Sequence, residues 1–182
     1  DSAGNSASVT RSVTVQDASA PVVMAPAPIS VAATDASGTQ SSDAVISAFL
    51  GGASANDAVD GSLPVSHDAP ARFPLGVTVV TFSAVDSAGN TGSAQSSVTV
   101  SDQTAPEIQL NGNASMTLNT GDSYTEPGAS ASDNVDGPVP VIISGSVDTG
   151  IPGLYQIRYD ASDSAGNSAS VTRSVTVQDD KP

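Results

Sequence analysis

Two acidic turn motifs recur along this sequence, and their side chains are the groups best suited to chemistry. One motif reads Asp57-Ala-Val-Asp60-Gly61 and returns as Asp133-Asn-Val-Asp136-Gly137. The other reads Asp-Ser-Ala-Gly-Asn and starts at both Asp86 and Asp163. Calcium takes about 6–8 hard oxygen ligands from carboxylates, carbonyls and water. Because the chain has no Cys and 1 His, these motifs favour calcium over zinc.

The two motifs are expected to meet at one end of a β-sandwich. We place Asp133 and Asp136 in the loop between the second and third strands of a domain. Asp163 and Asn167 fall in the loop between its last two strands, and the incoming linker brings a further carboxylate. Carboxylates so close together repel one another unless a divalent cation lies between them. The sequence therefore predicts a calcium site of Asp102, Asp133, Asp136, Asp160, Asp163 and Asn167.

An equivalent calcium site is expected at an earlier junction, formed by Asp17, Asp57, Asp60, Asp86 and Asn90. Since the later set has Asp160 where the earlier one has Ser83, we expect the later site to bind calcium more tightly. The alternative is turn chemistry alone, because both motifs are ordinary turn formers whose Asp side chains accept hydrogen bonds from the backbone. The sequence leaves both interpretations open.

Internal repetition suggests how the chain is divided. Residues 1–17 read DSAGNSASVTRSVTVQD, residues 163–179 are identical to them, and residues 86–102 carry a diluted version. Identity of this extent indicates duplication within a repeat protein. We predict the final strand of a preceding repeat at 1–17, one sandwich at 18–101, a second at 102–179, and a linker to the next repeat at 180–182.

The pattern of apolar residues predicts strands. Tyr155, Ile157 and Tyr159 alternate with polar residues on one strand, and residues 77–82 form a β-branched run. Residues 43–50 are compatible with a short capped helix or a strand, and the surrounding β pattern favours the strand. Strands with turn signals at this spacing predict an all-β fold of immunoglobulin-like sandwiches arranged end to end, with about seven strands in each.

The composition argues against several classes of function. A net charge of -14 disfavours binding to nucleic acid or to anionic membrane surfaces. No stretch approaches the roughly 20 apolar residues of a membrane span, so direct membrane insertion is not expected. The single histidine, His67, lies in a polar stretch without a nucleophile elbow. We therefore predict that the chain is not an enzyme.

Residues 102–179 resemble a bacterial immunoglobulin-like domain of large surface proteins. The segments that carry this resemblance are Asp102-Gln-Thr-Ala-Pro106, Gly121-Asp-Ser-Tyr-Thr-Glu-Pro-Gly128, Asp133-Asn-Val-Asp-Gly137, Gly153-Leu-Tyr155 and Asp163-Ser-Ala-Gly-Asn167. The resemblance covers essentially the whole domain. It implies an immunoglobulin-like sandwich in an extracellular protein, with no catalytic residues to carry over.

Residues 18–101 resemble the hyalin-repeat (HYR) module, which is also an immunoglobulin-like sandwich. The matching segments are Ile29-Ser-Val31, Asp57-Ala-Val-Asp-Gly61, Phe73-Pro-Leu-Gly-Val-Thr-Val-Val-Thr-Phe82 and Asp86-Ser-Ala-Gly-Asn90. Animal versions carry a cysteine pair that this chain lacks, which fits a bacterial origin. The resemblance implies a role in adhesion or spacing.

Together these features predict a structural spacer of a cell-surface adhesin or filament, stiffened by calcium at the junctions between domains. Its partners would be neighbouring repeats of the same polypeptide. One alternative is a module that binds glycan or protein, for which residues 34–44 offer the best candidate loop. Another is a self-assembling fibre subunit in which residues 1–17 pair with another molecule.

Overall fold

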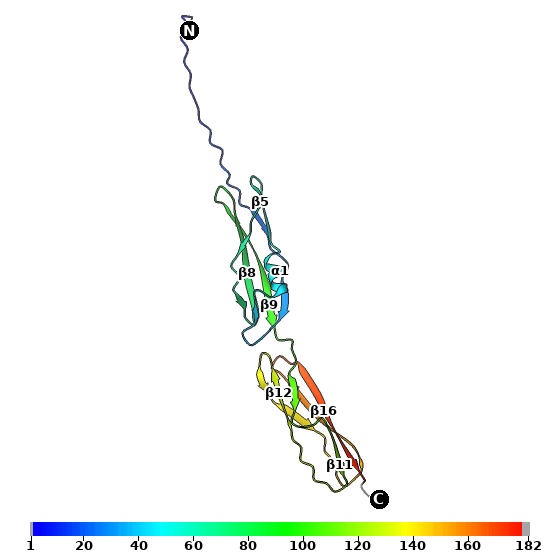
Figure 1. Ribbon diagram of the computed structural model, residues 1–182. Helices are drawn as coiled ribbons and strands as arrows, with labels where there is room; N and C mark the ends of the chain where they lie inside the picture. The colour runs from blue at the N-terminus through cyan, green and yellow to red at the C-terminus, as the bar shows by residue number, and fades with distance from the viewer. Residues whose placement is uncertain (1, 180–182) are drawn as a thin grey trace.

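The computed structural model describes residues 2–179, which form two slender β-sandwiches in line, preceded by an extended N-terminal segment (Figure 1). Residues 5–21 of the described chain contain neither helix nor strand. The assignment of residues 1–17 to a preceding repeat stays a prediction. The linker predicted at 180–182 lies outside the described residues, as does Asp1. The predicted all-β fold of tandem immunoglobulin-like sandwiches is confirmed.

The first sandwich packs a four-stranded sheet, in the order β2-β9-β8-β6, against a three-stranded sheet, in the order β1-β4-β5. A short β3-β7 pair and one helix complete it within the described residues. Its elements are β1 (Val22–Met24), β2 (Ile29–Ala32), β3 (Thr39–Gln40), α1 (Ala44–Leu50), β4 (Ser54–Asp57), β5 (Gly61–Leu63), β6 (Ser66–His67), β7 (Arg72–Phe73), β8 (Gly76–Val85) and β9 (Thr91–Ser101).

The strand expected at residues 43–50 is wrong, because this segment forms α1. The Asp43 carboxylate accepts hydrogen bonds from the backbone N–H groups of Val45 and Ile46, at 2.9 and 3.3 Å. That N-cap satisfies N–H groups that a helix start otherwise leaves unpaired. Ile46 and Phe49 then lie on one face of the helix and are buried in the core. Local capping and helical spacing therefore outweigh the β pattern of the flanking sequence.

The second sandwich has seven strands among the described residues. A sheet in the order β10-β12-β13 packs against one in the order β11-β16-β15-β14. The strands are β10 (Glu107–Leu110), β11 (Ser115–Asn119), β12 (Ala129–Asp133), β13 (Gly137–Val139), β14 (Val141–Ser144), β15 (Gly153–Ser162) and β16 (Ser168–Gln178).

The first strand of each sandwich is split between the two sheets. In the second domain β10 pairs with β12, whereas β11 pairs in parallel with β16. The first domain repeats this arrangement, with β1 beside β4 and β2 parallel to β9. When β10 and β11 are counted as two parts of the first strand, the acidic turn of the second domain lies between the second and third strands, β12 and β13, as expected from the sequence.

The two cores are built differently. The first gathers apolar side chains, among them Phe49, Phe73 and Phe82. In the second, Tyr159 replaces Phe82 and Arg173 replaces Ser96 at corresponding positions of the main hairpins. Arg173 is fully buried and forms an ion pair with Glu126. Its guanidinium also donates to the carbonyls of Asn111 and Asn113 and lies 5.4 Å from the centroid of the Tyr159 ring.

Candidate metal centres at the domain junctions

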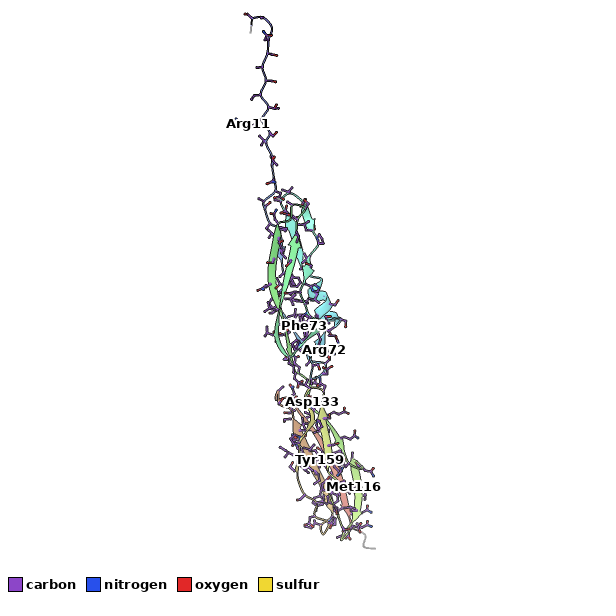
Figure 2. All side chains as sticks on the ribbon, turned by 90° about the vertical axis from the view of Figure 1, so that its left-hand side faces the viewer. Arg11, Arg72, Phe73, Met116, Asp133 and Tyr159 are labelled. Carbon is purple, nitrogen blue, oxygen red and sulfur yellow. The ribbon has the colours of Figure 1, made fainter. Side chains whose placement is uncertain are left out.

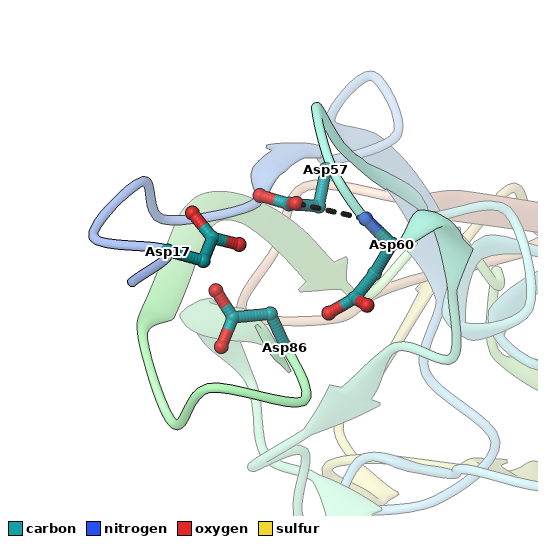
Figure 3. Close-up of side chains that lie close together, drawn as sticks. All are labelled: Asp17, Asp57, Asp60 and Asp86. Atoms are coloured by element: carbon teal, nitrogen blue, oxygen red, sulfur yellow. Dashed lines mark hydrogen bonds between the residues drawn. The ribbon is translucent and has the colours of Figure 1, made fainter. Parts of the chain in front are cut away.

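Four carboxylates meet at the end of the first sandwich where the N-terminal segment arrives (Figure 3). Asp17 comes from that segment, Asp57 ends β4, Asp60 lies in the β4–β5 turn and Asp86 follows β8. One oxygen of each carboxylate lies within 4.8 Å of one oxygen of every other. Asp57 and Asp86 are only 3% and 6% exposed. We call these four residues the first acidic cluster.

Tight turns hold the first acidic cluster in place. Asp57 Oδ1 accepts from the N–H groups of Val59 and Asp60 at 2.7 and 3.1 Å, and Gly61 closes this turn with a φ of 75°. The Asp60 carboxylate reaches across to the β8–β9 turn, where Ser87 donates to it from both N–H and hydroxyl. The turn chemistry that the motifs suggested is therefore present.

The β8–β9 turn fixes both Asp86 and the linker. The Asp86 carboxylate accepts from the backbone N–H and from the side-chain amide of Asn90, each at 2.7 Å. The same amide lies 3.3 Å from the Asp17 carbonyl and donates to it. Asn90 thus ties the linker to the turn.

Turn chemistry does not account for every carboxylate oxygen. Asp17 Oδ2 and Asp57 Oδ2 are buried and have no hydrogen-bond partner among residues 2–179. Buried polar atoms are nearly always paired, because burial without a partner is costly. Unpartnered anionic oxygens within a cluster of carboxylates are suitable ligands for a hard cation.

A second acidic cluster lies between the two sandwiches and consists of Asp102, Asp133 and Asp163. Figure 2 shows Asp133 at the level of the connection between the domains. One carboxylate oxygen of each residue lies within 4.8 Å of the others, and Asp133 and Asp163 are 7% and 9% exposed. Asp102 Oδ2 and Asp133 Oδ2 are again buried without a partner in the described part of the chain. Both junctions thus share one design.

The second cluster is also held by its turns. Asp133 Oδ1 accepts from the N–H groups of Val135 and Asp136 at 2.7 and 3.0 Å. The Asp163 carboxylate accepts from the N–H and the side-chain amide of Asn167, each at 2.8 Å. Asn167 and Asn90 therefore act as amide donors that orient a carboxylate.

The structure does not bring Asp160 or Asp136 into the second cluster. Asp160 lies on β15 and forms an ion pair with Arg158, whose Nη2 is 2.8 Å from Asp160 Oδ1. The Asp136 carboxylate instead accepts two hydrogen bonds from Ser164, one from the backbone N–H at 2.6 Å and one from the hydroxyl at 2.8 Å. The expectation of tighter binding at the later site loses its basis, because the first cluster gathers four carboxylates and the second three.

The turns also keep carboxylates ionised. Hydrogen bonds from the backbone N–H groups of Asp136 and Val135 hold the pKa of Asp133 below its ordinary value. Burial by itself would raise the pKa of Asp86, but the hydrogen bonds from Asn90 outweigh that effect and lower it. Both groups are therefore negatively charged at neutral pH, as cation ligands need to be.

The turn of the second cluster also contacts the first sandwich directly. The Asn134 side-chain amide donates to the Ala33 carbonyl at 3.0 Å. Val135 packs against the buried core of the first domain. We did not single out either residue from the sequence, because nothing there says which side of a turn faces a neighbouring domain.

The fold and the two clusters define a class of protein: tandem immunoglobulin-like repeats with acidic junctions. Residues 108–177, within the second sandwich, match the family model described as bacterial surface protein, Ig-like domain. The match covers less than half of the chain. The resemblance of residues 18–101 to the HYR module stays a prediction. Among the described residues, no helix is long and apolar enough to cross a membrane.

The solved structures similar to this chain include the following three. A lipoprotein from Bacteroides thetaiotaomicron is 32% identical over 42% of this chain and 39% of its own, with a TM-score of 0.38. The M60 catalytic domain with two CBM51 domains from Clostridium perfringens is 12% identical over 87% and 31%, with a TM-score of 0.48. Human protocadherin-24 EC1-2 is 16% identical over 88% and 100%, with a TM-score of 0.37.

The chain spans 39% of the lipoprotein and 31% of the Clostridium protein. A comparison with curated proteins finds no match.

Proposed function

We propose that this chain is a non-catalytic spacer of a bacterial surface protein, and that calcium at each domain junction stiffens it. The observation that carries this proposal is the pair of buried, unpartnered carboxylate oxygens in each acidic cluster. A cation would supply the partner that the turns leave out. Carboxylate oxygens, with no thiol in the chain, favour a hard divalent ion such as calcium.

The position of the carboxylates suggests what a bound cation would do. In each cluster one ligand comes from the linker, Asp17 or Asp102, and the others come from turns of the following sandwich. An ion shared between them ties the linker to the top of that sandwich. Rotation about the linker would then be restricted, so a string of domains becomes a rod.

The family match of the second sandwich supports a location at the cell surface. The partners in this proposal are neighbouring repeats of the same polypeptide, which the repeated junction design supports. As a spacer, the chain would hold a distal binding domain away from the cell. Near-identical repeats suit this role, since copying a repeat lengthens a stalk.

The test compares the chain in calcium with the chain in a chelator. We expect small-angle scattering to give a longer maximum dimension with calcium, and thermal melting to shift upward because the cation binds the folded state. Unchanged scattering and melting would overturn the proposal. A higher melting temperature with unchanged scattering would retain the cation sites but exclude stiffening. Magnesium at the same concentration provides the control for ionic strength.

A second candidate function, self-assembly through residues 1–17, is supported by a separate observation. Val13 and Val15 are 78% and 91% exposed, whereas Val175 and Val177, at the same places of the identical segment in β16, are 0% and 2% exposed. A segment with the sequence of a core strand is suited to complete another molecule's sandwich. Light scattering of the chain with and without residues 1–17 would test it, and equal masses at every concentration would exclude it.

A further inference from the structure

The acidic turn of the first sandwich exposes an apolar residue that its counterpart buries. Val59, between Asp57 and Asp60, is 69% exposed. Val135, at the same place of the second motif, is partly buried against the core of the preceding sandwich. The two turns have the same backbone hydrogen bonds. What differs is the presence of a sandwich in front of the turn.

The built junction shows which surface such a turn contacts. Val135 meets the end of the first sandwich where β2 stops, and Asn134 donates to the Ala33 carbonyl there. Ala33 continues β2 along β9, with its N–H donating to the Ser101 carbonyl at 2.9 Å. A partner for Val59 should present the equivalent end of another sandwich.

The sequence of residues 1–17 identifies the type of that partner. This segment has Arg11 where β16 has the buried Arg173, whereas β9 of the first sandwich has Ser96 at that place. Figure 2 shows Arg11 on the extended segment, away from both sandwiches. A domain that ends with this segment would therefore be of the second type, with the ionic core.

The described second sandwich offers a matching surface at its far end. Thr120 takes the place of Ala33, since its N–H donates to the Gln178 carbonyl at 2.9 Å. Next to it, the Gly121 N–H donates to the Thr149 carbonyl at 2.8 Å and so fixes the turn that carries Ile151. Ile151 is 59% exposed. An apolar residue is thus available at the end where a following turn would dock.

We propose that Ala58 and Val59 form a docking surface for the far end of a second-type sandwich, at Thr120 and Ile151. Because Ala58 replaces Asn134, this junction lacks the amide hydrogen bond to a carbonyl and depends on apolar contact. The inference rests on the proposed spacer function and deepens it by naming the partner domain. It does not require that a cation bind.

The test places a copy of residues 102–162 ahead of Asp1. Because residues 1–17 are identical to 163–179, they complete the added copy, so the extended chain contains a second-type domain followed by residues 18–182. The chain has no cysteine, so Val59→Cys gives a single thiol whose labelling rate reports exposure. Val77→Cys is the matched control, since Val77 is 68% exposed on β8, away from this turn.

In the 182-residue chain, Val59→Cys and Val77→Cys should react at similar rates. In the extended chain, labelling at position 59 should slow by at least about tenfold while position 77 is unchanged. Changing Ile151→Asp only in the added copy should restore fast labelling at position 59. Equal rates at 59 and 77 in the extended chain would overturn the proposal.

Folding of the added domain is checked by Val13→Cys, because Val13 takes the place of the buried Val175. If position 13 stays reactive, the added domain has not folded. The labelling test is then repeated on a chain in which residues 18–182 follow residues 1–179, and the labelling rate at position 59 decides in the same way. Calcium titration of the extended chain separates the two hypotheses. If position 59 is protected from labelling and no calcium binds, the docking proposal holds and the cation sites are excluded. If calcium binds and position 59 is not protected, the cation sites hold and docking is excluded.

Discussion

The aspartates at the junctions divide their two oxygens between different partners. Asp57 and Asp133 each use Oδ1 to close a turn, whereas Oδ2 is buried without a partner among the described residues. The sequence presented turn formation and cation binding as alternatives. In the structure they are compatible, because a carboxylate has more than one acceptor oxygen. A test at the level of single residues therefore has to separate the loss of a cation ligand from the loss of the turn hydrogen bonds.

Asp133→Asn should weaken calcium binding at the second cluster by at least about tenfold, since it removes one of three carboxylates. The amide oxygen can still accept the turn hydrogen bonds, so the fold should persist. Calorimetric titration measures the effect. Asp160→Asn is the control, because Asp160 pairs with Arg158 outside the cluster and its loss should leave calcium affinity unchanged. Equal losses in both variants would contradict the assignment.

Glu126 and Arg173 form the least predictable part of the molecule. The sequence motif around Tyr124 and Glu126 supported a family resemblance, but nothing in it indicated a contact with β16. In the structure the hydroxyls of Tyr124 and Tyr159 both donate to the Glu126 carboxylate, beside the buried guanidinium. A buried arginine can be predicted only when its acidic partner is known to lie within reach.

Glu126→Gln should destabilise the second sandwich by about 2–3 kcal/mol, somewhat below the cost for a fully buried pair because the Glu126 side chain is 25% exposed. Chemical denaturation measures this loss. The double variant Glu126→Gln/Arg173→Met removes the unpaired charge as well and should recover part of it. If the double variant lost more stability than Glu126→Gln and Arg173→Met lose in total, the ion pair could not be the origin of the effect.

The same pair gives a pH dependence with a defined sign. Burial would raise the pKa of Glu126, but hydrogen bonds from Tyr124 and Tyr159 hold it below the ordinary value of 4.5. The stabilisation is therefore present above pH 4.5 and is lost as the pH falls through the lowered pKa. Acid unfolding of the wild type should accordingly be steeper in this range than that of Glu126→Gln.

At the scale of elements, the strands with strong alternation were predictable, whereas the helix was predicted only as the less favoured alternative. β15 has the face of Tyr155, Ile157 and Tyr159 expected from the sequence, and the latter two are buried. The split of the first strand was missed, because pairing partners depend on the other sheet. α1 was considered but the strand was preferred, because a seven-residue helix has too few turns for its period to stand out against β neighbours.

Asp43→Ala should destabilise the first sandwich by about 1 kcal/mol, because it leaves two N–H groups of α1 without their cap. Asp43→Asn keeps an acceptor oxygen and should cost much less. Thermal melting of both variants makes the comparison. If the two substitutions had equal effects, the charge of Asp43 and not its capping oxygen would be responsible.

At the scale of the whole molecule, the repeated segments predicted two tandem sandwiches with an acidic set at each junction. They did not predict which of the two junctions gathers more carboxylates. The repeated motifs pointed to most members of both acidic clusters. Asp160 was wrongly included because its pairing with Arg158, two residues earlier on the same strand, was not considered. The packing of Val135 against the preceding sandwich could not be predicted from the sequence either. Contacts between domains depend on orientation, and a sequence pattern carries no information about orientation.

Calcium titration of the intact chain should show two steps, with the tighter step at the first cluster, which has one carboxylate more. Asp60→Asn should weaken the tight step alone, because Asp60 belongs only to that cluster. Isothermal calorimetry resolves the steps. If the tight step survived Asp60→Asn and disappeared in Asp133→Asn, the second cluster would be the tighter calcium site.

The parallel pairing of β2 with β9, and of β11 with β16, determines how this molecule responds to tension. In each sandwich the chain enters at the acidic end and leaves from the last strand at the opposite end. A pull on the two termini therefore loads all the hydrogen bonds between these strands at once, in shear, and does not peel them apart one by one. A tether built from such units would yield only when a whole ladder breaks, which suits attachment to a surface in flowing liquid.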